Sequence, residues 1–285
     1  MSARLDLLGV RPDLVSRILA ARPDRTSHPE AWWTVDRTFQ DIVGNLGISD
    51  GFGGWPPIPV DGSDVTRHIY IWTFVAAVPH TRRFHAERGI PDDLSREMLR
   101  RIGKGIEESR AMYGVSGLLF GQWTPPLILR GVTYALGRLE YDFGSSVNMH
   151  IPGREDRGRL EPADCDASIS RAREFAARYF PEHPSPRFCC HSWLLDPQLA
   201  EYLPAESNLV RFQRRFRMVT DERPECADRD ILGYVFGRRA PEEGDIPQEL
   251  IATLPQDTAL RRAFVTHLRS GRHWYGRTGW LLADT

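Results

Sequence analysis

The sequence lacks the features that mark several broad classes of protein. Its longest apolar runs fall far short of the roughly 20 residues that a bilayer-spanning helix needs, so we expect no membrane segment. Its 37 basic residues are balanced by 38 acidic ones, a formal net charge of −1. Phosphate binding usually leaves a basic excess, so we expect no nucleic acid as the main partner. The sequence also shows no internal repeat and no low-complexity tract.

Cysteine is scarce as well. The four cysteines, Cys165, Cys189, Cys190 and Cys226, show neither the spacing of a zinc site nor a disulfide framework. The run Cys189-Cys190-His191 contains metal-ligating side chains, but neighbours on a strand point to opposite faces and cannot all converge on one ion. We therefore expect reduced thiols and no metal.

The N-terminus, MSARLDLLGVRPDLV, contains acids and lacks the basic-then-apolar order of a signal peptide. The chain has 285 residues, of which 41% are hydrophobic. These features predict a cytoplasmic globular protein that is long enough for two domains.

Helical periodicity dominates the first part of the chain, with predicted helices over residues 1–20, 32–46, 65–87 and 92–113. We expect the first helix to be interrupted near Arg11-Pro12. Residues 47–64 are rich in Gly and Pro and predict a loop. We expect a helical domain over residues 1–122, ending at the break around Trp123, Pro125 and Pro126, and a second domain over residues 123–285.

This helical part is rich in aromatic residues that could line a ligand cavity. Large aromatics at helical spacing more often pack in a core, and we prefer that interpretation. The residues concerned are Trp32, Trp33, Trp55, Tyr70, Trp72 and Phe74.

From about Tyr134 the pattern alternates, as in β-strands. Residues 139–143 and 147–151 predict a hairpin whose polar face carries Glu140 and His150. A helix capped by Asp166 or Ser168 should follow. Further on, residues 230–236 read as a buried strand, residues 258–269 as a helix, and HWYGRTGWLL as a last strand.

The central stretch of this second part is PRFCCHSWLLDPQLAEYLPAESNLVRFQRRFRMV, residues 186–219. It predicts a buried strand over residues 188–195, then a loop, then a helix capped by Ser207, with Leu209, Phe212 and Phe216 at helical spacing. Polar groups gather where this strand meets this helix, a common place for sites in folds that combine strands and helices.

The ordered motifs YALGRLEYDF, VNMHIPG, CHSWLLDPQL, FQRRF and LPQDTALRRAFVTHLRSG resemble a bacterial family of acyltransferase domain-containing proteins. Members have a helical N-terminal domain and a C-terminal domain like the GNAT N-acetyltransferases. The resemblance implies an α+β protein with a helical domain followed by a GNAT-like mixed sheet flanked by helices.

In GNAT enzymes the acyl thioester lies where the fourth and fifth strands splay apart. On this map VNMHIPG resembles the fourth strand and RFCCHSWLL the fifth, so the splay falls near His150 and His191. Transfer of an acyl group to an amine needs a base, and an imidazole on a polar strand face suits it. His150 is the first candidate base. His191 is adjacent, but it shares a strand face with Trp193 and Leu195, so a core histidine is the preferred interpretation. Glu140 could orient His150 or act as the base itself, but on an exposed hairpin we expect it to be solvated.

The resemblance further implies an acyl-CoA or acetyl-CoA co-substrate. Ser207-Asn208 resembles the start of the GNAT helix that contacts the pantetheine arm, although capping alone explains Ser207. Arg211, Arg214 and Arg215 could meet a cofactor phosphate or form a solvated basic face. Ser192 forms a polar set with His150, His191 and Asn208. In GNAT enzymes a Gly-rich loop that holds the pyrophosphate usually precedes the helix after the fourth strand. The corresponding segment here, LEPADCDAS, has no glycine and three acids, which would repel a pyrophosphate.

Three functions are therefore considered. The first is an acyl-CoA-dependent transferase acting on a small amine or hydroxyl acceptor. The second is a non-catalytic GNAT-like module that binds a ligand or protein, which the acidic segment favours. The third, a thiol enzyme using Cys190, is disfavoured because Cys190 and His191 point to opposite faces of a regular strand.

Overall fold

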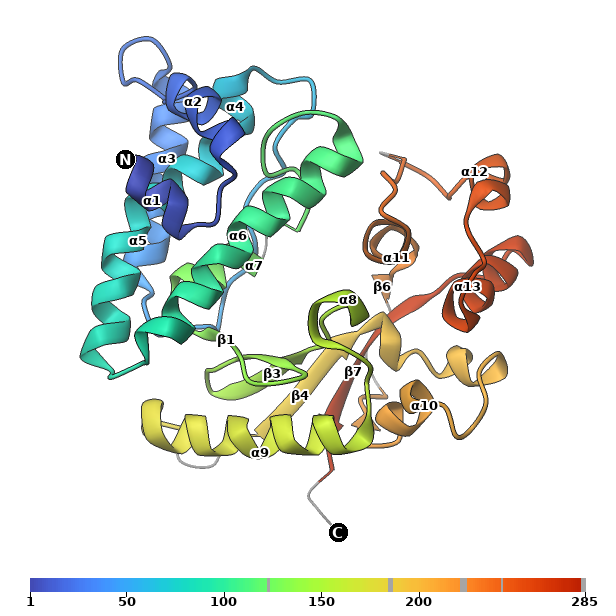
Figure 1. Cartoon of the computed structure of the whole chain (residues 1–285). Coiled ribbons are helices and arrows are strands. Elements are labelled where there is room, and N and C mark those ends of the chain that lie inside the picture. Colours follow the sequence, from blue (N-terminus) through green and yellow to red (C-terminus); the bar gives the residue numbers. More distant parts are fainter. Residues whose placement is uncertain (122–123, 184–186, 221–224, 242, 283–285) are drawn as a thin grey trace. The chain divides into compact units, whose positions relative to one another are not determined.

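The computed structural model describes residues 1–121, 124–183, 187–220, 225–241 and 243–282. The chain divides into two compact units (Figure 1). The first comprises Met1–Ala135, Asp142–Ser145 and Phe175–Pro184, and the second Leu136–Tyr141, Ser146–Glu174 and Ser185–Thr285. Among the described residues, no helix is both long and apolar enough to cross a bilayer.

The first unit is built mainly from helices, as expected. They are α1 (Ser2–Leu7), α2 (Pro12–Ala20), α3 (Pro29–Gly44), α4 (Asp64–Arg67), α5 (Ile69–Glu87), α6 (Asp92–Tyr113) and α7 (Thr124–Leu129), followed by the short strand β1 (Thr133–Ala135). The predicted interruption of the first helix is confirmed, because Pro12 begins α2. The expected boundary residue Trp123 lies outside the described residues.

Two local features explain the ends of these helices. The single helix expected over residues 65–87 is instead two, because His68 leaves the helical conformation and its buried ring contacts the Asp64 carbonyl and Ser116 Oγ (2.8 Å). Helix α6 carries Asp92 and Asp93 in its first turn and ends at Gly114, whose φ of 71° suits glycine.

The second unit holds the mixed sheet. Its strands are β2 (Glu140–Asp142), β3 (Ser146–His150), β4 (Arg187–Ser192), β5 (Phe216–Met218), β6 (Glu225–Cys226) and β7 (Tyr275–Leu281). Their order is β2-β3-β4-β7-β5, with β6 paired to β7. Strands β3 and β4 are parallel, whereas β7 is antiparallel to β4, β5 and β6. The mixed sheet flanked by helices confirms the predicted fold class.

Helices complete this unit: α8 (Arg154–Arg157), α9 (Pro162–Tyr179), α10 (Asn208–Gln213), α11 (Asp228–Phe236), α12 (Gln248–Thr253) and α13 (Ala259–Arg269). Figure 1 shows α9 running alongside β3 and β4. Its Ser168 Oγ lies 3.0 Å from the Tyr141 hydroxyl, and Tyr141 meets Phe188 of β4 edge-on. Helices α11 and α13 share a second core with Trp274, which is fully buried.

Several sequence-based predictions were wrong in this unit. Residues 230–236 belong to helix α11, not to a strand. The helix expected to run through Phe216 ends at Gln213, and Phe216–Met218 instead pairs with β7. Strand β4 stops at Ser192, and Trp193–Leu195 form a 3₁₀ turn. Asp166 and Ser168 lie inside α9 and do not cap it, because α9 begins at Pro162.

Candidate functional site

The parallel strands β3 and β4 frame the candidate site. Their pairing runs from Ser146↔Arg187 to Asn148↔Cys189. Beyond that pair β3 continues to His150 and β4 to Ser192. The two strands therefore extend past their last paired residues at the end that carries His150 and His191.

Register places both histidines on one face of the sheet. Side chains alternate along a strand, so Asn148 and His150 share a face, as do Cys189 and His191, and Asn148 is paired with Cys189. Asn148 Oδ1 lies 4.0 Å from Cys189 Sγ, and its Nδ2 lies 3.4 Å from His150 Nε2. This face of β3 and β4 is only partly covered, since His150 is half-buried and His191 is exposed.

The opposite face is the core. Val147, Met149, Phe188 and Cys190 are all no more than 5% exposed. Complete burial raises the pKa of the Cys190 thiol well above its usual range. A thiol held protonated on the face opposite His191 is poorly suited to be a nucleophile, which agrees with the low weight given to that chemistry.

Strand β7 supports the ring of His191. His191 pairs with Thr278, whose Oγ1 lies 2.9 Å from its Nδ1. A Cβ at Gly276 would come within 2.9 Å of His191 Nε2, so only glycine leaves room for the ring there. The interpretation of His191 as a core histidine is wrong, because the imidazole is exposed and oriented by a hydroxyl.

Asp230 of α11 adds charge near this imidazole. Asp230 is exposed, but partial desolvation of its carboxylate by surrounding atoms raises its pKa, the charge of Glu225 raises it further, and His191 lowers it. Sequence analysis missed Asp230 because it assigned residues 230–236 to a buried strand. Tyr234, which the sequence offers either as an acid for the leaving thiolate or, as preferred, as a core tyrosine, is 46% exposed and is therefore not a core residue.

Glu140 does not have the exposed setting expected of it. The residue is 3% exposed, and its carboxylate oxygen lies 3.9 Å from Arg157 Nε. All three residues of β2 are buried, so Glu140 is not solvated, in contrast to the half-buried His150 of β3.

The segment between β3 and α9 supplies the basic groups that the sequence analysis overlooked. Arg154, Arg157 and Arg159 lie there with Gly153 and Gly158, and Gly158 has a φ of 79°. The useful signal was GREDRGR, immediately before the acidic LEPADCDAS. Asp166, one of those three acids, is ion-paired with Arg215, so its charge is compensated.

Arg138 lies beside this segment. It is 6% exposed, its Nε donates to the Arg159 carbonyl (3.0 Å), and its Nη1 has no hydrogen-bond partner among the described residues. Burial lowers the pKa of this guanidinium, whereas the charges of Glu140 and Asp164 raise it. A buried N–H without a partner costs free energy unless something accepts from it, which makes Arg138 a candidate ligand contact.

The four residues predicted to contact a cofactor, Ser192, Ser207, Asn208 and Arg211, differ in hydrogen bonding and in exposure. Ser192 Oγ caps the 3₁₀ turn by accepting from Leu194 N (3.1 Å), and Ser207 Oγ caps α10 by accepting from Val210 N (3.3 Å). Asn208 begins α10 half-buried, and Arg211 is exposed. The capping function considered for Ser207 is thus confirmed, and contact of these four residues with a cofactor remains a prediction.

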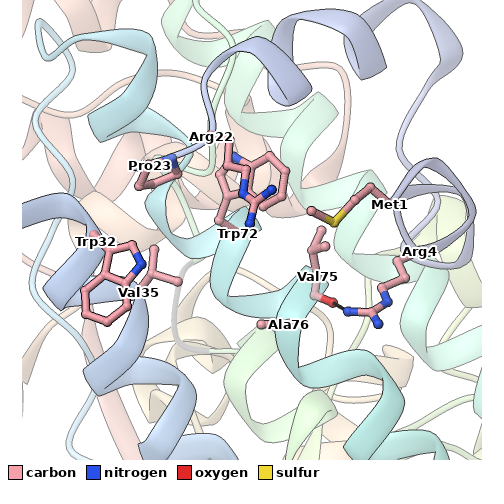
Figure 2. A pocket seen from close by; sticks show the side chains of 9 residues that line it. All are labelled: Met1, Arg4, Arg22, Pro23, Trp32, Val35, Trp72, Val75 and Ala76. Atoms are coloured by element: carbon pink, nitrogen blue, oxygen red, sulfur yellow. Dashed lines mark hydrogen bonds between the residues drawn. The ribbon is translucent and has the colours of Figure 1, made fainter. Parts of the chain in front are cut away.

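The aromatic residues of the first unit lie in the core, along the wall of a pocket, or exposed on the surface. Tyr70 and Phe74 are buried, and Trp55 packs on both. Trp32 and Trp72 line a pocket of about 220 Å³ beside α1, α3 and α5, shown in Figure 2. Trp33 is 60% exposed.

Comparison with known proteins assigns both parts of the chain. Residues 1–131 match the N-acyltransferase N-terminal domain, and residues 133–281 match the GNAT-like C-terminal domain. The chain belongs to the family with these two domains. No curated protein matches it.

Solved structures of acyltransferases are similar to this family member over nearly its whole length. One, in complex with decanoyl-CoA and teicoplanin, is 38% identical with a TM-score of 0.79, covering 97% of this chain and 85% of that one. A second, with CoA and 10C-teicoplanin, is 38% identical with a TM-score of 0.80, covering 98% and 86%. A third, with decanoyl-CoA, is 36% identical with a TM-score of 0.81, also covering 98% and 86%.

Proposed function

We propose that this family member transfers a medium-length acyl group from acyl-CoA to an amine of a small acceptor. The observation that carries the proposal is the pair of imidazoles, His150 and His191, on one sheet face where β3 and β4 run beyond their last paired residues. Membership of a two-domain acyltransferase family supports the same reaction.

The donor is proposed from relatives. Acyltransferases 36–38% identical to this chain bind decanoyl-CoA, and one of them binds teicoplanin as well. We infer a donor of similar chain length and an acceptor that presents an amine. A hydroxyl acceptor would also need this base to remove its proton. Amines and alcohols must therefore both be tested as acceptors.

In the proposed reaction the acceptor nitrogen attacks the thioester carbonyl and loses a proton to an imidazole. The C–S bond then breaks, the amide forms, and the CoA thiolate leaves and takes up a proton. Of the two imidazoles we assign the base to His191, because it is exposed and the Thr278 hydroxyl orients its ring. His150 is assigned to positioning the acceptor.

The basic segment is proposed to hold the CoA phosphates. Arg154 and Arg159 are exposed beside the buried, incompletely bonded Arg138, and guanidinium groups bind phosphate oxygens well. The repulsion expected from LEPADCDAS is weakened by the pairing of Asp166 with Arg215. Asn208 and Arg211 are retained as further candidate contacts to the cofactor.

The test is thiol release from acetyl-, octanoyl- and decanoyl-CoA in the presence of teicoplanin, simple amines or simple alcohols. We expect turnover to be fastest with octanoyl- or decanoyl-CoA and an amine. His191→Ala should lower kcat by about 100-fold or more, as loss of a general base does. His150→Ala should act mainly through KM for the acceptor.

The matched control is His28→Ala, which removes an exposed histidine of the first unit and should leave kcat unchanged. An unaltered kcat in His191→Ala would remove that residue from the mechanism. Thermal unfolding with each acyl-CoA tests the alternative, a non-catalytic module. Stabilisation by acyl-CoA without turnover of any acceptor would favour that alternative.

A further inference from the structure

A second cluster of reactive side chains lies apart from the two histidines. Cys226 ends β6, Asp228 begins α11 and His273 precedes β7. One ligand atom from each residue, a thiol sulfur, a carboxylate oxygen and an imidazole nitrogen, lies within 4.8 Å of the others. The three side chains converge although up to 47 positions separate them in the sequence.

The backbone holds this cluster in place. Cys226 pairs with Tyr275 across β6 and β7, and Ala227 N donates to the Trp274 carbonyl (2.8 Å). The Asp228 carboxylate, 5% exposed, accepts from Trp274 N (2.8 Å) through Oδ1 and lies 2.8 Å from His273 Nδ1 through Oδ2. The carboxylate is therefore fixed, whereas the ring of His273, with 38% of its side chain exposed, has room to turn.

The three groups are the ligand types that zinc prefers. Thiolate, imidazole and carboxylate bind Zn²⁺ at about 2.0–2.3 Å in tetrahedral sites, which places neighbouring N and O ligand atoms roughly 3.3 Å apart. The 2.8 Å separation of Asp228 Oδ2 and His273 Nδ1 must therefore open by a few tenths of an ångström. A small rotation of the half-exposed imidazole supplies that movement.

The burial of the carboxylate also favours a cation. Asp228 is 5% exposed, and a divalent cation beside its carboxylate would compensate a charge that is largely removed from water.

We propose that Cys226, Asp228 and His273 bind a zinc ion, with a water molecule as the fourth ligand. Cys226 and His273 each lose a proton when the metal binds. The ion would join β6, α11 and β7 at one point. Because β7 carries Thr278 and Gly276 beside His191, and α11 carries Asp230, the site would also stabilise the surroundings of that imidazole.

Metal binding is tested on the full chain with any affinity tag removed and metals stripped by chelator. Isothermal titration with Zn²⁺ should give one ion per chain. Replacement by Co²⁺ should give a thiolate-to-metal charge-transfer band. Cys226→Ser should abolish that band and weaken Zn²⁺ binding by at least about tenfold, the range seen even when only an outer partner of a metal ligand is lost.

Cys189→Ser is the matched control, because Cys189 is also a partly accessible strand cysteine near histidines, and it should keep both the band and the affinity. Zn²⁺ should raise the unfolding temperature of the wild type and of Cys189→Ser but not that of Cys226→Ser. If the wild type binds no stoichiometric Zn²⁺, or if Cys226→Ser binds Zn²⁺ equally well, the proposed site is wrong. Asp228 would then serve only as a hydrogen-bond acceptor. These readouts do not depend on acyl transfer, so they fail separately from the proposed function.

Discussion

At the scale of single residues, the surroundings of His191 matter more than its identity. A histidine on a strand can be a core residue, a ligand or a base, and its neighbours decide which. Here Thr278 Oγ1 holds Nδ1 at 2.9 Å, and Gly276 leaves the space that Nε2 occupies. Neither neighbour could be identified from sequence, since both lie more than 80 positions away.

A pair of glycine substitutions in β7 tests this dependence. In Gly276→Ala the new Cβ would lie 2.9 Å from His191 Nε2, at the end of a side chain that can turn away. We expect kcat to fall about tenfold or more, because displacing a base by about 1 Å has large effects, while the unfolding temperature changes little. Thiol-release kinetics and thermal unfolding measure the two quantities.

Gly279→Ala is the comparison. Its Cβ would lie 2.8 Å from Phe216 Cβ, a rigid part of the opposite, buried face. Overpacking there should lower the free energy of unfolding by about 1–3 kcal/mol. Equal losses of stability in the two variants would show that Gly276 is needed for packing and not for the ring of His191.

At the scale of elements, short apolar segments misled the sequence analysis. Residues 230–236 contain Ile231, Leu232 and Val235, a run that is compatible with either a strand or a helix. Asp228 and Asp230 in the first turn and Gly237 with a φ of 61° at the C-terminus match a helix. Phe216 has helical spacing from Phe212, yet its pairing with Leu281 places it in β5. Tertiary pairing overrides a weak periodic signal.

The segment between β3 and α9 is the element whose function is most open to test. If its arginines hold CoA phosphates, Arg159→Ala should raise KM for acyl-CoA about three- to tenfold at low salt while leaving kcat nearly unchanged, because it removes one exposed charge–phosphate contact. The difference from wild type should shrink as salt is added.

Arg269→Ala, at the exposed end of α13, is the charge-matched control and should leave KM unchanged. Equal KM values for wild type and Arg159→Ala at low salt would exclude Arg159 from the phosphate site. Arg157 is less suitable for this test, since its removal would leave the buried Glu140 without the ion pair seen here.

At the scale of the whole molecule, buried histidines link folding to pH. His85 of α5 is 2% exposed, and its Nδ1 lies 2.7 Å from Ser95 Oγ. Burial, with a smaller contribution from the charge of Arg82, lowers its pKa to about 4. The folded protein therefore resists protonation of this ring, whereas the unfolded chain accepts a proton near its usual pKa of about 6.5.

This lowered pKa sets the direction in which the stability of the protein changes with pH. Above about pH 6.5 the ring is neutral in both states and contributes no pH dependence. As pH falls toward 4, only the unfolded chain takes up the proton, so stability falls by up to about 3 kcal/mol. Urea unfolding between pH 7 and 4 should show a smaller loss for His85→Gln than for wild type. Equal losses would show that His85 is protonated in the folded protein.

Sequence alone determined the class of the protein and much of its outline. Local patterns, which a sequence displays directly, gave the family motifs, the helical first part, the two strands around VNMHIPG and RFCCHSWLL, α13 and the last strand. The candidates His150 and His191 came from the same source. The domain boundary near residue 122 stays a prediction.

Tertiary structure decided what depends on distant partners. Pairing and packing between segments far apart in the chain bury Glu140, support His191 with β7, bring Arg138 to the Arg159 carbonyl, and bring Cys226, Asp228 and His273 together. Local periodicity carries no information about such pairs, because it records which face a side chain takes and not what that face meets.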